Sequence, residues 1–63
     1  MDKAVVERYI GKNVFFLAEG SPWLGGFLKE IISDTMIIEY RGEEQSYLLS
    51  SITSIKDDRG ARD

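Results

Sequence analysis

The sequence predicts one small domain that is mainly β, with a short N-terminal α-helix followed by a strongly bent five-stranded antiparallel small barrel. Three observations support this prediction. The 63 residues leave room for a single domain. After residue 12 the apolar pattern changes from helical spacing to short runs rich in β-branched and aromatic residues. Short turn segments separate these runs, so neighbouring strands are antiparallel, and so small a sheet must curl to hide its apolar face.

The predicted helix covers residues 2–10. Asp2 can cap it, because a carboxylate accepts hydrogen bonds from the first backbone N–H groups. Gly11 supplies the left-handed residue that commonly ends a helix. One apolar stripe is formed by Val5, Val6, Tyr9 and Ile10. A helix this short is marginal alone, so we expect it to lie on the sheet.

The five strands are predicted at residues 13–18, 23–33, 36–40, 45–49 and 52–56. The second strand is long enough to need a bend, and Gly25-Gly26 is the natural place for a bulge. Turns are expected at residues 19–22, 34–35 and 41–44, with a short break, one turn of 3₁₀ helix, at residues 50–51. Residues 57–63 lack apolar periodicity. The predicted domain is therefore 2–56, with 57–63 as a flexible tail.

Composition narrows the function. The chain has no Cys and no His, so it lacks a disulfide, a thiolate metal site and the commonest general base. It also lacks a Gly-x-Ser-x-Gly elbow and a phosphate-binding loop. We therefore expect no enzymatic activity, no cofactor and no metal. The net charge of −3 argues against nonspecific binding to a phosphate backbone. Without an apolar run of membrane length or a signal segment, the expected location is the cytoplasm.

The strands carry apolar residues on both faces, which is the main clue to function. In a sheet with one solvent-exposed face, apolar and polar residues alternate along each strand. Here several runs are apolar at consecutive positions, namely residues 14–17, 27–28, 31–32, 36–38 and 47–49. One face can fill the interior, and one short helix cannot cover the other. Small domains without disulfides or metals often gain stability by association. The pattern favours a subunit interface, and scattered exposed aliphatic residues are the alternative.

The layout resembles that of the Sm-like (Hfq-type) family of small β-barrels. The similarity covers residues 4–56. Residues 9–14 (YIGKNV) resemble the family's junction between helix and first strand, and residues 26–28 (GFL) resemble its bent second strand. Residues 34–38 (DTMII) fall at its turn into strand three, and residues 49–55 (LSSITSI) resemble its last turn and strand. The resemblance implies a closed ring in which strands four and five of adjacent subunits pair edge to edge.

The family's RNA-binding residues do not carry over. Met36 is followed by Ile37 where the family typically has Asn, and residues 48–51 (LLSS) stand where it has Arg-Gly or Tyr-Lys-His. The resemblance therefore implies the fold and the assembly more strongly than RNA binding.

Three functions remain open. The first is a non-enzymatic Sm-like assembly module, a homo-oligomeric ring that scaffolds or binds a partner protein. The second is binding of single-stranded RNA or DNA by stacking bases on aromatic residues beside cations. The possible cations are Lys12, Lys29, Arg41 and Lys56. The third is a monomeric SH3-like barrel that docks a peptide in an aromatic groove. Candidate nucleic-acid or partner-binding residues are Trp23, Phe27, Lys29, Tyr40 and Arg41. Candidate subunit-interface residues are Tyr47, Leu48, Leu49, Ile52 and Ile55.

Overall fold

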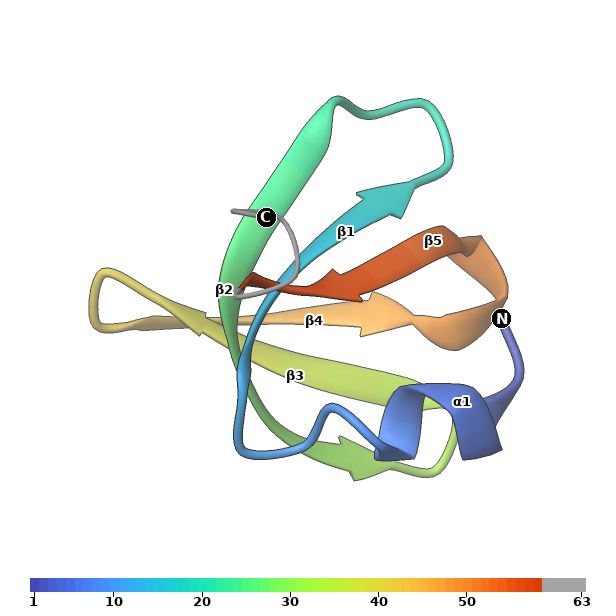
Figure 1. The fold of residues 1–63 in the computed structure, drawn as a ribbon, viewed down its shortest axis with the longest axis horizontal. Helices are drawn as coiled ribbons and strands as arrows, with labels where there is room; N and C mark the ends of the chain where they lie inside the picture. The colour runs from blue at the N-terminus through green and yellow to red at the C-terminus, as the bar shows by residue number, and fades with distance from the viewer. Residues whose placement is uncertain (59–63) are drawn as a thin grey trace.

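The computed structural model describes residues 1–58 and confirms a mainly β domain with one short helix and five antiparallel strands (Figure 1). In chain order the elements are α1 (Lys3–Glu7), β1 (Asn13–Ala18), β2 (Trp23–Ile32), β3 (Thr35–Tyr40), β4 (Glu43–Leu48), the 3₁₀ turn η1 (Leu49–Ser51) and β5 (Ile52–Asp57). Of the predicted tail, Asp57 belongs to β5, and residues 59–63 lie outside the described residues.

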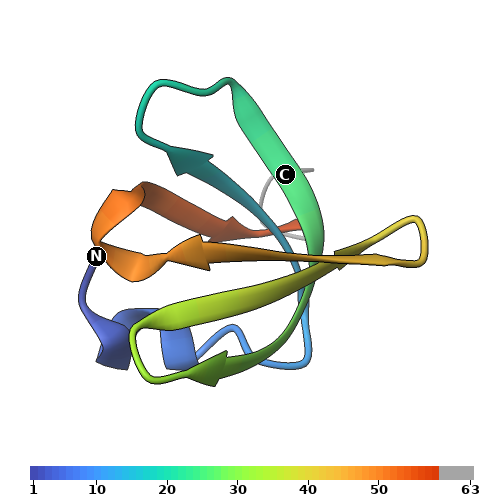
Figure 2. The same ribbon diagram turned by 180° about the vertical axis from the view of Figure 1, so that it is seen from behind.

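The five strands form one open sheet in the order β4-β3-β2-β1-β5. The strand β2 is long and curved, and it links the two halves of the sheet (Figures 1 and 2). Its first half, from Trp23 to Phe27, pairs with β1, and its second half, from Phe27 to Ile32, pairs with β3. Within the described part of the chain, β4 and β5 are each paired on one side only, so both are edge strands.

The bulge in β2 is not at the predicted glycine pair. The register shifts instead between Leu28 and Glu30. Leu28 is fixed there by the segment that follows the helix: its carbonyl accepts from the Gly11 N–H at 2.8 Å, and its N–H donates to the Lys12 carbonyl at 3.0 Å. The irregularity therefore lies where the backbone of residues 11–12 docks on β2.

Gly26 has a packing role. A Cβ at this position would clash with the Ile38 side chain and lie 3.0 Å from the Glu39 carbonyl oxygen. At Gly25 a Cβ would lie 3.1 Å from the Phe15 ring, so this ring covers the glycine on the other face of the sheet. The two glycines thus permit close approaches on opposite sides of β2.

The helix is shorter than predicted. Asp2 caps it as expected, since its carboxylate accepts from the Ala4 N–H at 3.3 Å. The predicted stripe is wrong at two positions: Val5 and Ile10 are 39% and 42% exposed, whereas Val6 is buried. Ile10 lies beyond the end of α1 at Glu7, so helical spacing does not continue that far. Val5 lies within α1, where Val6 is the residue that faces the core.

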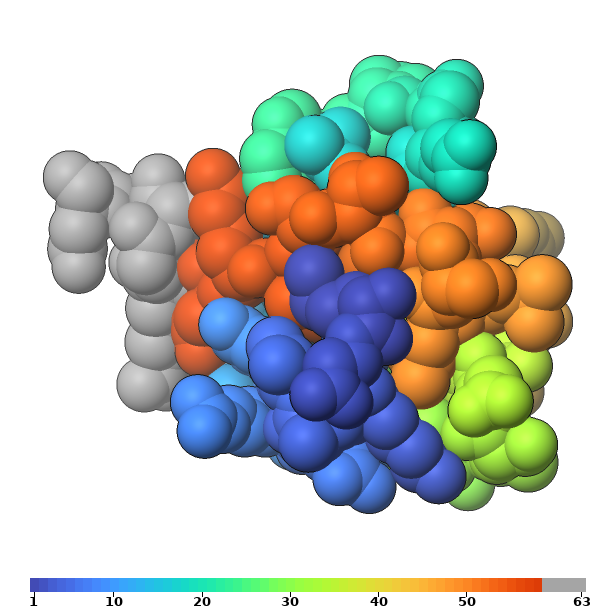
Figure 3. Space-filling view, turned by 90° about the vertical axis from the view of Figure 1, so that its right-hand side faces the viewer, coloured from blue at the N-terminus to red at the C-terminus, as the bar shows by residue number. Residues whose placement is uncertain are grey.

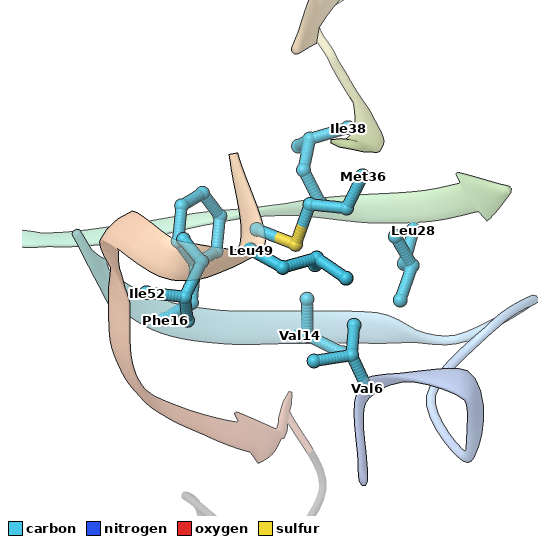
Figure 4. Packing of buried hydrophobic residues seen from close by; sticks show 8 residues of the cluster. All are labelled: Val6, Val14, Phe16, Leu28, Met36, Ile38, Leu49 and Ile52. Carbon is cyan, nitrogen blue, oxygen red and sulfur yellow. The ribbon is translucent and has the colours of Figure 1, made fainter. Parts of the chain in front are cut away.

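Eight buried side chains, drawn from α1, β1, β2, β3, η1 and β5, make the core (Figure 4). They are Val6, Val14, Phe16, Leu28, Met36, Ile38, Leu49 and Ile52. The Phe16 ring packs edge-on against Tyr47 with 5.0 Å between ring centroids. Figure 3 shows the N-terminal segment lying over the segment that carries η1, and the Met1 ammonium donates to the Leu49 carbonyl at 2.6 Å.

One hairpin turn is tighter than predicted, and another is shifted by one residue. The β3–β4 loop is only Arg41-Gly42, and both residues have positive φ, 53° and 81°. This backbone matches the twist of paired strands, so β4 begins at Glu43, two residues earlier than predicted. The β2–β3 turn is centred one residue earlier than predicted, with Ser33 at φ 57°.

Candidate functional site

The outward face of the sheet follows from the strand register. Residues directly opposite each other in an antiparallel pair point to the same face. Val14 and Phe16 point into the core, so Phe15 and Leu17 point outward. Their partners share that face, and these are Gly25 and Trp23 on β2 and Lys56 and Ser54 on β5.

Trp23 is one of the predicted binding residues, and it lies on this outward face. Its side chain is 47% exposed, so it is not part of the core. The Lys56 ammonium nitrogen lies 4.6 Å from the centroid of the indole ring, which is a cation–π contact. The structure therefore joins an exposed aromatic residue with a cation that sequence reasoning could not pair with it.

Three other predicted residues, Phe27, Tyr40 and Arg41, come together in a shallow pocket of about 280 Å³. Gly25 and Gly26 of β2 also line it. The remaining lining residues are Asn13, Val14, Phe15, Glu39 and Asp58.

The pocket combines aromatic rings with charges of both signs. Phe15, Phe27 and Glu39 are half-buried, whereas Tyr40 is 51% exposed. The Arg41 guanidinium carbon lies 5.3 Å from the centroid of the Tyr40 ring. Sequence reasoning missed Phe15 and Glu39, although the pairing of Asn13 with Phe27 and of Phe27 with Glu39 brings their strands to this point.

The fifth predicted residue, Lys29, does not line the pocket. Its ammonium nitrogen donates to Glu44 Oε2 at 2.6 Å across the face of the sheet. This hydrogen bond and the charge of Glu44 raise the pKa of Lys29 above its usual value, and the carboxylates of Glu39 and Glu30 act in the same direction. Lys29 is therefore surrounded by the carboxylates of Glu44, Glu39 and Glu30.

The five candidate interface residues differ in how exposed their side chains are. Leu49 and Ile52 are 3% and 2% exposed, so the core already uses both side chains. Tyr47 and Ile55 are half-buried and pack against the core. Leu48 differs, with 57% of its side chain exposed at the end of β4.

The outer edge of β4 presents unpaired backbone groups. In a two-residue hairpin the residues flanking the turn, Tyr40 and Glu43, form a hydrogen-bonded pair, and such pairs recur at every second residue. The N–H and C=O groups of Glu44, Ser46 and Leu48 then point away from β3. The Leu49 N–H, one position further, donates to the Asp34 carbonyl at 2.8 Å, as this alternation requires.

Across residues 1–58, no three Asp or Glu side chains are grouped so that they could hold a metal ion. Helix α1, the one α-helix in that range, is far too short to cross a membrane. No protein-family model, curated protein or solved structure matches the chain.

Proposed function

We propose that the protein is a non-enzymatic assembly module of the Sm-like type, which forms homo-oligomers by pairing β4 of one copy with β5 of the next. The observation that carries this proposal is the position of the two open edges. The strands paired on one side only are β4 and β5. These are the strands that the resemblance to Sm-like chains implies for subunit pairing. Unpaired edges of this kind readily accept a strand from another chain.

Charge supports this pairing. In an antiparallel arrangement the acidic start of β4, with Glu43 and Glu44, faces the end of a neighbour's β5, where Lys56 lies. Glu44 is opposite Glu39 and Lys56 is opposite Phe15, so both side chains are on the outward face. Opposite charges across a strand pair stabilise it by roughly 0.2–1 kcal/mol.

Exposed aliphatic surface supports it as well. Leu48 and Ile32 are 57% and 56% exposed, and both are paired with Thr35, one on each side of it. A neighbouring strand at the edge of β4 would cover Leu48. Burial of apolar surface contributes about 25 cal/mol per Å². A 63-residue domain buries little apolar surface of its own, so this added burial would stabilise it appreciably.

The test is the solution mass of the chain, measured by native mass spectrometry and light scattering. The single variants Glu44→Lys and Lys56→Glu should each shift the population towards monomer, and the double variant should restore the oligomer. Lys29→Gln removes the ion pair that holds Glu44 within one chain and changes no residue of the edge strands, so it should not shift the population towards monomer. A wild-type chain that is monomeric at micromolar concentration would refute the proposal.

A second variant tests the backbone directly. Ser46→Pro removes one outward N–H group of β4 without touching the β3–β4 ladder, since proline is tolerated on edge strands. We expect a folded monomer by circular dichroism. An oligomer that persists in this variant would show that assembly uses another surface.

Binding of single-stranded RNA or DNA is a second candidate function, favoured by the contact between Trp23 and Lys56. A base can stack on an exposed aromatic ring beside a cation. Titration with uridine-rich and adenine-rich RNA at low salt should then quench the fluorescence of Trp23, the single tryptophan in the sequence. Unchanged fluorescence and no shift in a gel would exclude this function.

A further inference from the structure

The pocket on the outward face has the composition of a site for a cation. Three aromatic rings contribute to its walls, from Phe15, Phe27 and Tyr40. Its lining also includes the carboxylate of Glu39 and the guanidinium of Arg41. The faces of aromatic rings carry negative potential and attract cations, most strongly where the rings are partly shielded from water.

We propose that this pocket binds an arginine side chain presented by a partner polypeptide. A guanidinium group is planar and weakly hydrated, so it stacks on aromatic rings while donating paired hydrogen bonds to a carboxylate such as Glu39. The volume of about 280 Å³ lies at the small end of the range for ligand pockets, which suits one side chain. This inference concerns a different surface from the edges of β4 and β5.

The surroundings of the pocket favour a basic partner. Glu39 also lies beside Glu44 in the register, and Lys29 is already held by Glu44. The whole chain carries a net charge of −3. A basic segment is therefore attracted to the chain as a whole at long range.

Arg41 provides a test of the proposal, because it is a cation in the lining of a site proposed for a cation. Its guanidinium already lies against Tyr40, so one ring of the pocket accommodates this group within the chain. An incoming arginine would meet a like charge there. Removing the charge of Arg41 should strengthen binding, and removing the charge of Glu39 should weaken it.

The experiment is a titration of the isotopically labelled full chain with a short blocked Gly-Arg-Gly peptide, followed by NMR. Matched peptides carry citrulline or lysine in place of arginine. We expect shifts at the amides of Asn13, Phe15, Gly26 and Phe27, which line the pocket. Citrulline has nearly the shape of arginine without its charge, so the citrulline peptide should bind far more weakly.

Two substitutions test the sign of the charge. Glu39→Gln should weaken binding of the arginine peptide by about tenfold, because a hydrogen bond to a charged group is lost. Arg41→Asn should strengthen it by roughly two- to fivefold, and asparagine tolerates the positive φ of 53° at this position. Trp23→Ala is the control on the same face, outside the pocket, and should leave the affinity unchanged.

Opposite signs would overturn the proposal. If Arg41→Asn weakened binding and Glu39→Gln strengthened it, the pocket would be a site for anions. Equal binding of the arginine and citrulline peptides, or no shifts at millimolar peptide, would also overturn it. Repeating the titration on the Ser46→Pro variant separates this outcome from a failure of edge-to-edge assembly, because that variant leaves the pocket intact.

Discussion

Replacing Gly26 with alanine should destabilise the fold, because the space for a side chain there is already filled. The added Cβ would overlap the Ile38 side chain, which is 1% exposed and has no room to retreat. It would also lie 3.0 Å from the Glu39 carbonyl oxygen, which is held by the β2–β3 ladder. Both obstacles are rigid, so β2 and β3 would have to separate locally.

The size of the effect follows from two opposing contributions. Overpacking a core site costs about 1–3 kcal/mol. Alanine also restricts the unfolded chain, which returns about 0.4–1 kcal/mol. The net loss should be about 1–2 kcal/mol, equivalent to a fall in Tm of roughly 5–15 °C for a domain of this size.

Gly25→Ala is the matched control. The neighbouring atoms at 3.1 and 3.2 Å belong to the Phe15 ring, which is half-buried on the outward face and can tilt away. Its Tm should stay within a few degrees of the wild type. Both variants are melted by far-UV circular dichroism at equal protein concentration, since association would itself raise Tm. Equal Tm values for the two variants would refute the reasoning.

Three further predictions concern the core, a turn and an ion pair. Phe16→Ala removes a fully buried ring at a cost of about 3–5 kcal/mol; this approaches the whole stability of such a domain, about 3–9 kcal/mol, so urea titration should show a largely unfolded chain. Gly42→Ala places a Cβ at φ 81° and should lower the free energy of unfolding by about 1–2 kcal/mol in urea, whereas an unchanged midpoint would contradict the turn geometry. Glu44→Gln should return the pKa of Lys29 towards its usual value, as measured by NMR. The raised pKa means that the pair stabilises the fold below the usual lysine range, and that this contribution is lost only as pH rises through the raised value; an unchanged Lys29 pKa in the variant would contradict the pairing.

The number of strands and their succession along the chain could be predicted because their signals are local. Runs such as Val14 to Leu17 favour extended structure, and Gly42 marks a tight turn. The bulge in β2 could not be placed, because its position depends on the docking of Gly11 and Lys12 on Leu28. That contact joins segments far apart in the sequence, so no local pattern reveals it.

The pocket shows the same limit. Phe27, Tyr40 and Arg41 were identified as single residues from their chemical types, but their meeting place depends on the register of three strands. Glu39 looks like an ordinary surface carboxylate in the sequence, and only its pairing with Phe27 brings it to the pocket. Leu49 was predicted to lie at a subunit interface, but the structure places it in the core. An apolar residue next to a break between two strands is compatible with either position, so the sequence alone could not decide.

The strand order has a consequence for how the chain folds. Three of the four neighbouring strand pairs connect consecutive strands, but β5 returns across the whole meander to pair with β1. Closing so long a loop is slow and entropically costly, so β5 should dock last and its amides should exchange fastest with deuterium. It is also the element whose exchange between two copies, a domain swap, would recreate every native contact between β1 and β5.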